Sequence, residues 1–309
     1  MPVFYIILAL LTALTVGLCV FILWGVNFSC KRGKPSVYKL TGEFADRMKE
    51  GIDWTNAKEK ESVSIKSHDG LNLSGVYIDN DKTDILFILF HGYRSGAVHD
   101  FSGAVRFYYD RGYSILLVDQ RSHGMSEGKY ITYGARERFD CRDWCRYAKE
   151  RFPEKKVFID GISMGASTVL MASGLDLPDN VVGVIADCGY TSPYEIISKV
   201  AAEMGYPVKI VMPVLSSAIK LIAGFDPKGC STLDAMEKNT LPVLLVHGKA
   251  DSFVPYEMSV RTYDACRAPK TLLIVDNADH GVSFFVDNEK VVKVLSDFIN
   301  DSISRKERV

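Results

Sequence analysis

The chain has 309 residues, 47% of them hydrophobic and 24% charged, and its formal net charge is −1. This length predicts one large domain with a small additional segment, and the apolar fraction is sufficient for a sizeable core. The balanced charge and the lack of long charged blocks argue against a nucleic-acid-binding protein.

The first predicted element is a membrane helix. Residues 2–29 carry no charge, and the apolar run 3–26 would be about 36 Å long as a helix, enough to cross a bilayer. Trp24 lies near its end, where aromatic side chains favour the headgroup region. We predict a single-pass anchor over residues 1–30. A cleaved signal peptide is the alternative, but it would need a basic segment before the apolar run and small residues at a cleavage site.

Basic residues follow the predicted anchor directly. The positive-inside rule puts Lys31, Arg32 and Lys34 in the cytoplasm, together with the rest of the chain, and the N-terminus outside. The seven cysteines, an odd number at irregular spacing, agree with reduced thiols in that compartment. We predict a juxtamembrane connector over residues 31–60, of which 41–60 is amphipathic and charged.

Residues 61–309 show apolar strand patterns that alternate with helical patterns. A hairpin is expected first, with strands 62–66 and 71–78. The other expected strands are 84–90, 113–118, 156–160, 181–186, 241–246 and 271–275, and the expected helices are 98–111, 135–151, 163–174, 256–266 and 288–304. This alternation predicts an α/β fold with a mostly parallel eight-stranded sheet and flanking helices.

One long segment, residues 189–239, interrupts this alternation. It is much longer than a usual crossover loop and has helical character over 195–202 and 209–225. We expect Pro207 and Pro213 to break the second region. The segment is predicted to form a helical lid, whose apolar side chains either line an acyl pocket or pack the lid onto the domain.

A pentapeptide between a strand and a helix supplies the candidate nucleophile. Gly161-Ile162-Ser163-Met164-Gly165 follows the strand 156–160 and precedes a helical pattern. In that context a G-x-S-x-G sequence predicts a nucleophile elbow, a tight turn that exposes the serine at the sheet edge. The N-terminus of the following helix favours an oxyanion there.

A serine nucleophile needs a general base and a carboxylate that orients it. Asp251 follows the strand 241–246, and His280 lies in the loop after the strand 271–275. Ser163, Asp251 and His280 therefore occur in the order nucleophile, acid, base, and we predict that they form a catalytic triad.

Three other side chains compete for these roles. Asp276 and Asp279 are alternative acids, but they lie beside His280 in the chain rather than after the preceding strand. His247 ends a strand, and we expect it to pack or to form hydrogen bonds there.

The loop after the strand 84–90 is expected to complete the site. It begins with His91-Gly92-Tyr93, at the position that supplies one oxyanion-hole amide. We predict an oxyanion hole formed by the backbone N–H groups of Tyr93 and Met164, and we expect His91 to shape the loop by hydrogen bonding.

The chain resembles the α/β-hydrolase superfamily. The segments that carry this resemblance are 91–93, 119–126, 161–165 and 187–193, together with Asp251 and His280. The chain is most similar to the bacterial branch of serine aminopeptidase-like and monoacylglycerol-lipase-like hydrolases. Segment 119–126 is close to that family's D-x-R-G-H-G-x-S turn, with Ser122 where glycine is usual. The resemblance covers residues 61–304 and implies the α/β-hydrolase fold.

These features predict a membrane-anchored serine hydrolase that cleaves a small-molecule or lipid ester through an acyl-enzyme, with no metal or organic cofactor. Peptide or amide hydrolysis by the same triad is an alternative, for which acidic lid residues would have to hold a substrate amine. Glu195, Glu203 and Asp226 are the acids available, at wide spacing. A non-catalytic scaffold is a second alternative, which the presence of both Ser163 and His280 disfavours.

Overall fold

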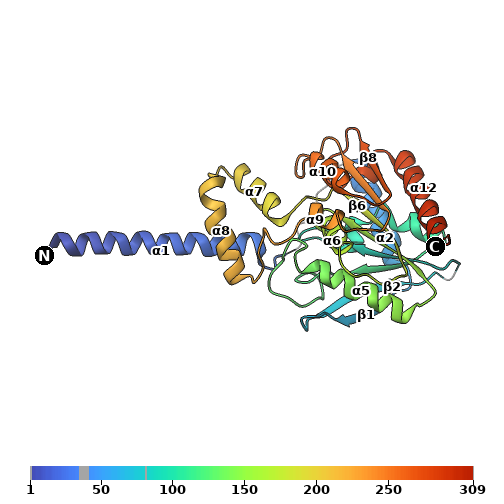
Figure 1. Cartoon of the computed structure of the whole chain (residues 1–309), viewed down its shortest axis with the longest axis horizontal. Coiled ribbons are helices and arrows are strands. Elements are labelled where there is room, and N and C mark those ends of the chain that lie inside the picture. Colours follow the sequence, from blue (N-terminus) through green and yellow to red (C-terminus); the bar gives the residue numbers. More distant parts are fainter. Residues whose placement is uncertain (1, 35–41, 81, 309) are drawn as a thin grey trace.

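The computed structural model describes residues 2–34, 42–80 and 82–308 (Figure 1). It contains a mixed sheet of eight strands in the order β1-β2-β4-β3-β5-β6-β7-β8. The strands are β1 (Glu61–Lys66), β2 (Asn72–Ile78), β3 (Ile85–Phe90), β4 (Ser114–Val118), β5 (Lys156–Ile162), β6 (Val181–Asp187), β7 (Val243–Gly248) and β8 (Lys270–Val275). Within the described residues β2 is the one strand that runs opposite to the others, so the predicted mostly parallel eight-stranded sheet is confirmed.

Helices cover both faces of the sheet. They are α2 (Glu43–Asn56), α3 (Ala97–Asp100), α4 (Val105–Asp110), α5 (Glu137–Arg151), α6 (Met164–Ala172), α9 (Thr232–Met236), α10 (Glu257–Ala265), α11 (Ser283–Val286) and α12 (Asn288–Lys306). In β3, Phe87 and Leu89 belong to the core under α3, α4, α11 and α12. Leu86 and Ile88 belong to the opposite core, under α5 and α6. This double burial explains why β3 is an uninterrupted apolar run.

The helix expected over 98–111 is instead two short helices, α3 and α4. The break lies where α2 packs on the chain, because Gly51 of α2 approaches the carbonyl group of Ser102 so closely that no side chain would fit. Gly103, a poor helix former, lies in the same break against Phe285. Tertiary packing therefore overrides the local helical pattern.

The connector expected over 31–60 contains a helix that packs on the domain. Helix α2 places Phe44, Met48 and Trp54 against the core on its side of the sheet. Residues 35–41 of this connector lie outside the described residues.

The segment 189–239, predicted to form a helical lid, contains the helices α7 (Pro193–Glu203) and α8 (Val208–Ile222). Neither expected break occurs within the helix: Pro207 directly precedes α8 as its N-cap, and Pro213 lies inside the continuous helix. Met212, Leu215 and Ile219, which lie before and after Pro213, are buried. Their packing keeps the helix continuous although the proline lacks one backbone hydrogen bond. Helix α9 does not join the lid, because Met236 packs into the core beside α6.

Helix α1 (Pro2–Cys30) projects from the domain, and α8 lies beside its C-terminal part (Figure 1). By length and composition it could span a membrane, with a mean hydropathy of 2.9 over its most apolar window. Its last residues are not free of the domain. Val26 and Cys30 are fully buried in a third apolar cluster, together with Met212 and Leu215 of the lid.

Candidate active site

The turn between β5 and α6 holds Ser163 in a strained conformation. Ser163 has φ +57° and ψ −113°, and it directly precedes α6. A side chain at Gly161 would collide with the backbone of Gly165, and one at Gly165 would collide with the carbonyl group of Phe90. Both flanking positions therefore require glycine, as a nucleophile elbow does.

Three side chains from different loops meet at the carboxyl edge of the sheet. His280 Nε2 lies 2.9 Å from Ser163 Oγ, and His280 Nδ1 lies 2.7 Å from Asp251 Oδ2. Ser163 follows β5, Asp251 follows β7 and His280 follows β8. All three are nearly or fully shielded from solvent. The structure thus brings the three predicted residues together in the predicted order of contact.

The hydrogen bonds assign the proton on His280. The Asp251 carboxylate only accepts hydrogen bonds, so His280 Nδ1 carries the proton and Nε2 faces Ser163 with a lone pair. The other carboxylate oxygen, Oδ1, accepts from the backbone N–H groups of Phe253 and Val254, at 2.9 and 2.7 Å. Asp251 is therefore fixed in orientation, and it fixes the imidazole.

A second histidine also binds Asp251. His247 Nε2 lies 3.1 Å from Asp251 Oδ2 and 2.9 Å from the Val254 carbonyl oxygen, while its Nδ1 lies 2.6 Å from Ser259 Oγ. Burial opposes ionisation of Asp251, but its hydrogen bonds with His247 and His280 hold its pKa well below the usual range. The sequence predicted only that His247 would pack or form hydrogen bonds at the end of its strand. Its position four residues before Asp251 was the available signal for the contact between them.

The competing acids lie elsewhere. Asp279 Oδ1 accepts from the backbone N–H of Ser252 at 2.8 Å. Asp276 forms an exposed ion pair with Lys249 at 3.2 Å. Asp251 is the carboxylate that contacts the His280 ring.

The loop after β3 passes next to Ser163. A Cβ atom on Gly92 would be 3.3 Å from that of Ser163. Within the described part of the chain, neither the Tyr93 nor the Met164 N–H donates to a loop or turn carbonyl. The N–H groups of the two predicted oxyanion donors are therefore not used in such bonds.

Buried side chains hold this loop in place. The Gln120 N–H donates to His91 Nε2 at 3.1 Å, so His91 Nδ1 carries the proton and donates to the Gly92 carbonyl at 2.7 Å. The Gly92 N–H donates to Asp100 Oδ2 at 2.6 Å. His91 thus shapes the loop as expected, whereas Asp100 was not singled out by the sequence.

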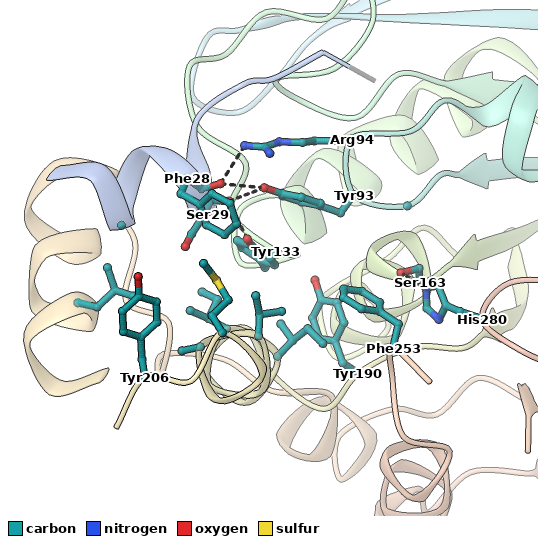
Figure 2. Close-up of a pocket in the computed structure, with 18 of the residues that line it drawn as sticks. Phe28, Ser29, Tyr93, Arg94, Tyr133, Ser163, Tyr190, Tyr206, Phe253 and His280 are labelled. Carbon is teal, nitrogen blue, oxygen red and sulfur yellow. Dashed lines mark hydrogen bonds between the residues drawn. The ribbon is translucent and has the colours of Figure 1, made fainter. Parts of the chain in front are cut away.

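Ser163 and His280 line a pocket of about 600 Å³, most of whose other walls are apolar (Figure 2). Figure 2 shows Ser163 and His280 at one end, Tyr190 and Phe253 near them, and Tyr206 at the far end. This volume lies within the ~300–1,000 Å³ typical of small-molecule sites.

Two groups of side chains within the described residues have metal-ligand atoms near one another. Cys188, Asp251 and His280 form one group, whose carboxylate and imidazole are engaged in the hydrogen bonds above. His68, Asp140 and Asp143 form the other, and there Asp140 binds the Arg121 guanidinium at 2.6 Å.

Two family models match adjoining stretches of the chain. Residues 81–220 match the model described as serine aminopeptidase, S33, and residues 225–306 match the model described as TAP-like protein. The chain belongs to the α/β-hydrolase superfamily. The superfamily expected from the sequence is thereby confirmed, and the serine aminopeptidase match agrees with the first part of the expected branch.

This α/β-hydrolase has relatives in bacteria. It is 28% identical to the protein YqkD of Bacillus subtilis over 245 residues, which cover 79% of this chain and 80% of YqkD. It is 24% identical to YfhR of Escherichia coli K12 over 252 residues, covering 79% of this chain and 82% of YfhR.

Solved structures share the fold of this α/β-hydrolase. The esterase Pf2001 of Pyrococcus furiosus has a TM-score of 0.65 at 24% identity and covers 87% of this chain and 99% of its own. Est1E of Butyrivibrio proteoclasticus, solved with ferulic acid bound, has a TM-score of 0.61 at 20% identity and covers 78% of this chain and 99% of its own.

The close approach at Gly165 predicts a large loss of stability for Gly165→Ala. The added methyl group would overlap the Phe90 carbonyl oxygen, which belongs to the sheet and cannot move freely. We expect the free energy of unfolding to fall by about 3 kcal/mol or more, measured by thermal unfolding of the purified chain.

Gly96→Ala is the matched control. Gly96 is extended with no atom within 4 Å of its Cβ position, so its replacement should change stability by less than ~0.5 kcal/mol. Equal unfolding temperatures for both variants would contradict this reading of the elbow.

Proposed function

We propose that this α/β-hydrolase is a membrane-anchored serine hydrolase that cleaves carboxylic esters through Ser163, His280 and Asp251. The observation that carries the proposal is the pair of contacts on one imidazole ring, 2.9 Å to the serine hydroxyl and 2.7 Å to the carboxylate. This is the arrangement that activates a serine for acyl transfer.

In the proposed reaction, Ser163 Oγ attacks the ester carbonyl carbon while His280 Nε2 takes the hydroxyl proton. The Tyr93 and Met164 N–H groups bind the oxyanion that forms. Collapse of this intermediate breaks the ester bond, and His280 returns the proton to the departing alcohol. Water, deprotonated by His280, then hydrolyses the acyl-enzyme, releasing the carboxylic acid and restoring Ser163.

Asp251 serves this cycle in two ways. Its bond to Nδ1 keeps the His280 tautomer in which Nε2 is the proton acceptor, and its negative charge stabilises the imidazolium that forms. The lowered pKa of Asp251 keeps it ionised throughout. Its second partner, His247, prevents the buried carboxylate from turning away from His280.

The lid acids disfavour the peptidase alternative. A substrate amine would need an uncommitted carboxylate near the pocket, yet Glu195 pairs with Arg261 at 2.7 Å and Asp226 with Lys220 at 2.9 Å. Glu203 pairs with Lys199. The apolar pocket walls and the fold shared with the esterase Pf2001 also support an ester substrate. The intact contact between Ser163 and His280 disfavours a non-catalytic scaffold.

The end of α1 supports an uncleaved anchor over residues 1–30. Signal peptidase cleavage after α1 would remove Val26 and Cys30, which are fully buried against the lid and domain. In this proposal residues 31–60 connect the anchor to a catalytic domain over 61–309, with the lid inserted at about 189–239. The basic flank at Lys31 and Arg32 supports a cytoplasmic catalytic domain.

Ester turnover tests the proposed reaction. The full chain in phospholipid nanodiscs should hydrolyse p-nitrophenyl esters and react with a fluorophosphonate probe. Ser163→Ala should abolish labelling and lower turnover by up to about 10⁶-fold, because the attacking oxygen is gone. Ser64→Ala, on exposed strand β1, is the matched control and should keep both. Wild-type turnover in Ser163→Ala would refute the proposed nucleophile.

Asp251→Asn tests the proposed acid. An amide cannot hold the productive His280 tautomer, so kcat should fall on the order of 10⁴-fold while the chain still folds. The control is Asp276→Asn, which removes only the exposed ion pair with Lys249 and should leave kcat within a factor of about two. Similar rates for the two variants would exclude Asp251 from the triad.

A further inference from the structure

The C-terminal part of α1 forms a wall of the active-site pocket. Phe21, Ile22, Gly25 and Phe28 line the same pocket as Ser163. Helix α8 adds lining residues beside α1 and packs against it, since Leu215 Cδ1 would be 3.2 Å from a Cβ atom on Gly25. The segment proposed as an anchor is therefore also part of the substrate site.

Side chains of the domain fix this wall in position. The last carbonyl groups of a helix lack intrahelical donors, and here the domain supplies them. The Tyr93 and Tyr133 hydroxyls donate to the Ser29 carbonyl at 2.8 and 2.6 Å, and Arg94 donates to the Phe28 carbonyl at 2.9 Å (Figure 2). Since Tyr93 and Arg94 belong to the loop beside Ser163, these hydrogen bonds tie the end of α1 to that loop.

The far end of the pocket lies at the level expected for a membrane surface. Helix α1 has 29 residues, about 44 Å of helix, whereas a bilayer core of about 30 Å needs about 20. The remaining third, from about residue 21, extends into the interfacial region. There Phe21 and Trp24 surround Tyr206 of the lid, with ring centroids 5.5 and 6.5 Å from it. Clustered aromatic rings of this kind favour the headgroup level.

The outer face of α8 is apolar beside α1. Ile210, Val214 and Leu221 are 71%, 45% and 86% exposed, a surface suited to the boundary between headgroups and acyl chains. Lys209 and Lys220 are the only charged residues of this helix, and both are exposed. Ile210 and Val214 also belong to the pocket lining. The pocket thus reaches the molecular surface between α1 and α8, where exposed apolar residues of both helices lie.

We propose that the pocket takes the acyl chain of a membrane lipid ester directly from the leaflet, between α1 and α8, and that α1 sets the accepted chain length. This inference rests on the proposed hydrolase function. A chain that moves from the leaflet into this pocket exchanges one apolar environment for another and does not pass through water. The ester group then meets Ser163 at the inner end, while the chain lies along Ile22 and Gly25.

Substitutions on α1 test the wall. Gly25→Leu adds a side chain that meets Leu215 and narrows the pocket, whereas Gly17→Leu adds the same side chain where no atom lies within 4 Å. For the full chain in nanodiscs, kcat/KM is measured with p-nitrophenyl palmitate and acetate. Gly25→Leu should lower the palmitate-to-acetate ratio about tenfold or more, because a pocket resists even one extra methylene. Gly17→Leu should keep the wild-type ratio.

Ile22→Ala, which removes atoms from the wall, should shift the preferred acyl-chain length of the ester toward longer chains.

A variant on the outer face tests entry from the leaflet. Leu221 is exposed on α8 and does not line the pocket, so Leu221→Glu puts a charge at the proposed lipid contact without altering the site. Turnover of 1-palmitoylglycerol embedded in the nanodisc should fall severalfold, while turnover of soluble p-nitrophenyl acetate should persist. Ser64→Glu, on β1, should change neither.

The outcomes separate the two proposals. If the wild-type chain hydrolyses neither ester and Ser163 resists the fluorophosphonate, the hydrolase function itself fails. A second outcome is that esters are hydrolysed while Gly25→Leu and Ile22→Ala show the same palmitate-to-acetate ratio of kcat/KM as Gly17→Leu. In that case α1 does not set the accepted chain length. If Gly25→Leu does not fold, Ile22→Ala decides. Unchanged turnover of embedded 1-palmitoylglycerol in Leu221→Glu would overturn leaflet entry.

Discussion

The close approach of α6 to the end of β3 is the constraint on which the site depends. Gly165 lies against the Phe90 carbonyl group with no room for a side chain. This contact brings the N-terminus of α6 beside the loop that follows β3, so Ser163, Met164 and Tyr93 become neighbours. The nucleophile and both proposed oxyanion donors are thus positioned by one backbone contact rather than by flexible side chains. Their geometry is set before any substrate arrives, which is what electrostatic stabilisation of a transition state requires.

A single buried charge organises the other half of the site. Asp251 is shielded from solvent, and an isolated carboxylate there would be costly. Two histidines and two backbone N–H groups satisfy its oxygens, so the charge is retained and tightly oriented. Each of these partners lies in the loops after β7 and β8 or at the end of β7. The order of the parallel strands therefore brings the acid and base to the serine.

Much of the fold and of the site could be predicted from local sequence signals. Apolar runs such as β3 identify strands because both faces of the sheet are covered, and the G-x-S-x-G turn has few physical alternatives between a strand and a helix. Ser122 illustrates a partial signal. It stands where the resembling family usually has glycine, and its φ of +64° explains that preference, while its hydroxyl bonds the Tyr130 carbonyl at 2.9 Å. The wrong predictions, a single helix over 98–111 and a break at Pro213, have a common cause. Tertiary packing decides both the break between α3 and α4 and the continuity of α8 through Pro213. The pocket wall provided by α1 was missed because an apolar helix has the same composition whether it meets lipid or protein.

The position of the pocket mouth has a consequence for handling the protein. Between α1 and α8, where Ile210 and Val214 are exposed, the proposed entrance accepts an extended hydrocarbon tail. Common solubilising detergents have tails of this kind, and they coat the apolar surface of α1 at high local concentration. In the proposed arrangement, extraction into micelles would surround the entrance with competitive inhibitors. Tail length and headgroup size of the detergent would then change the measured KM without any change in the protein.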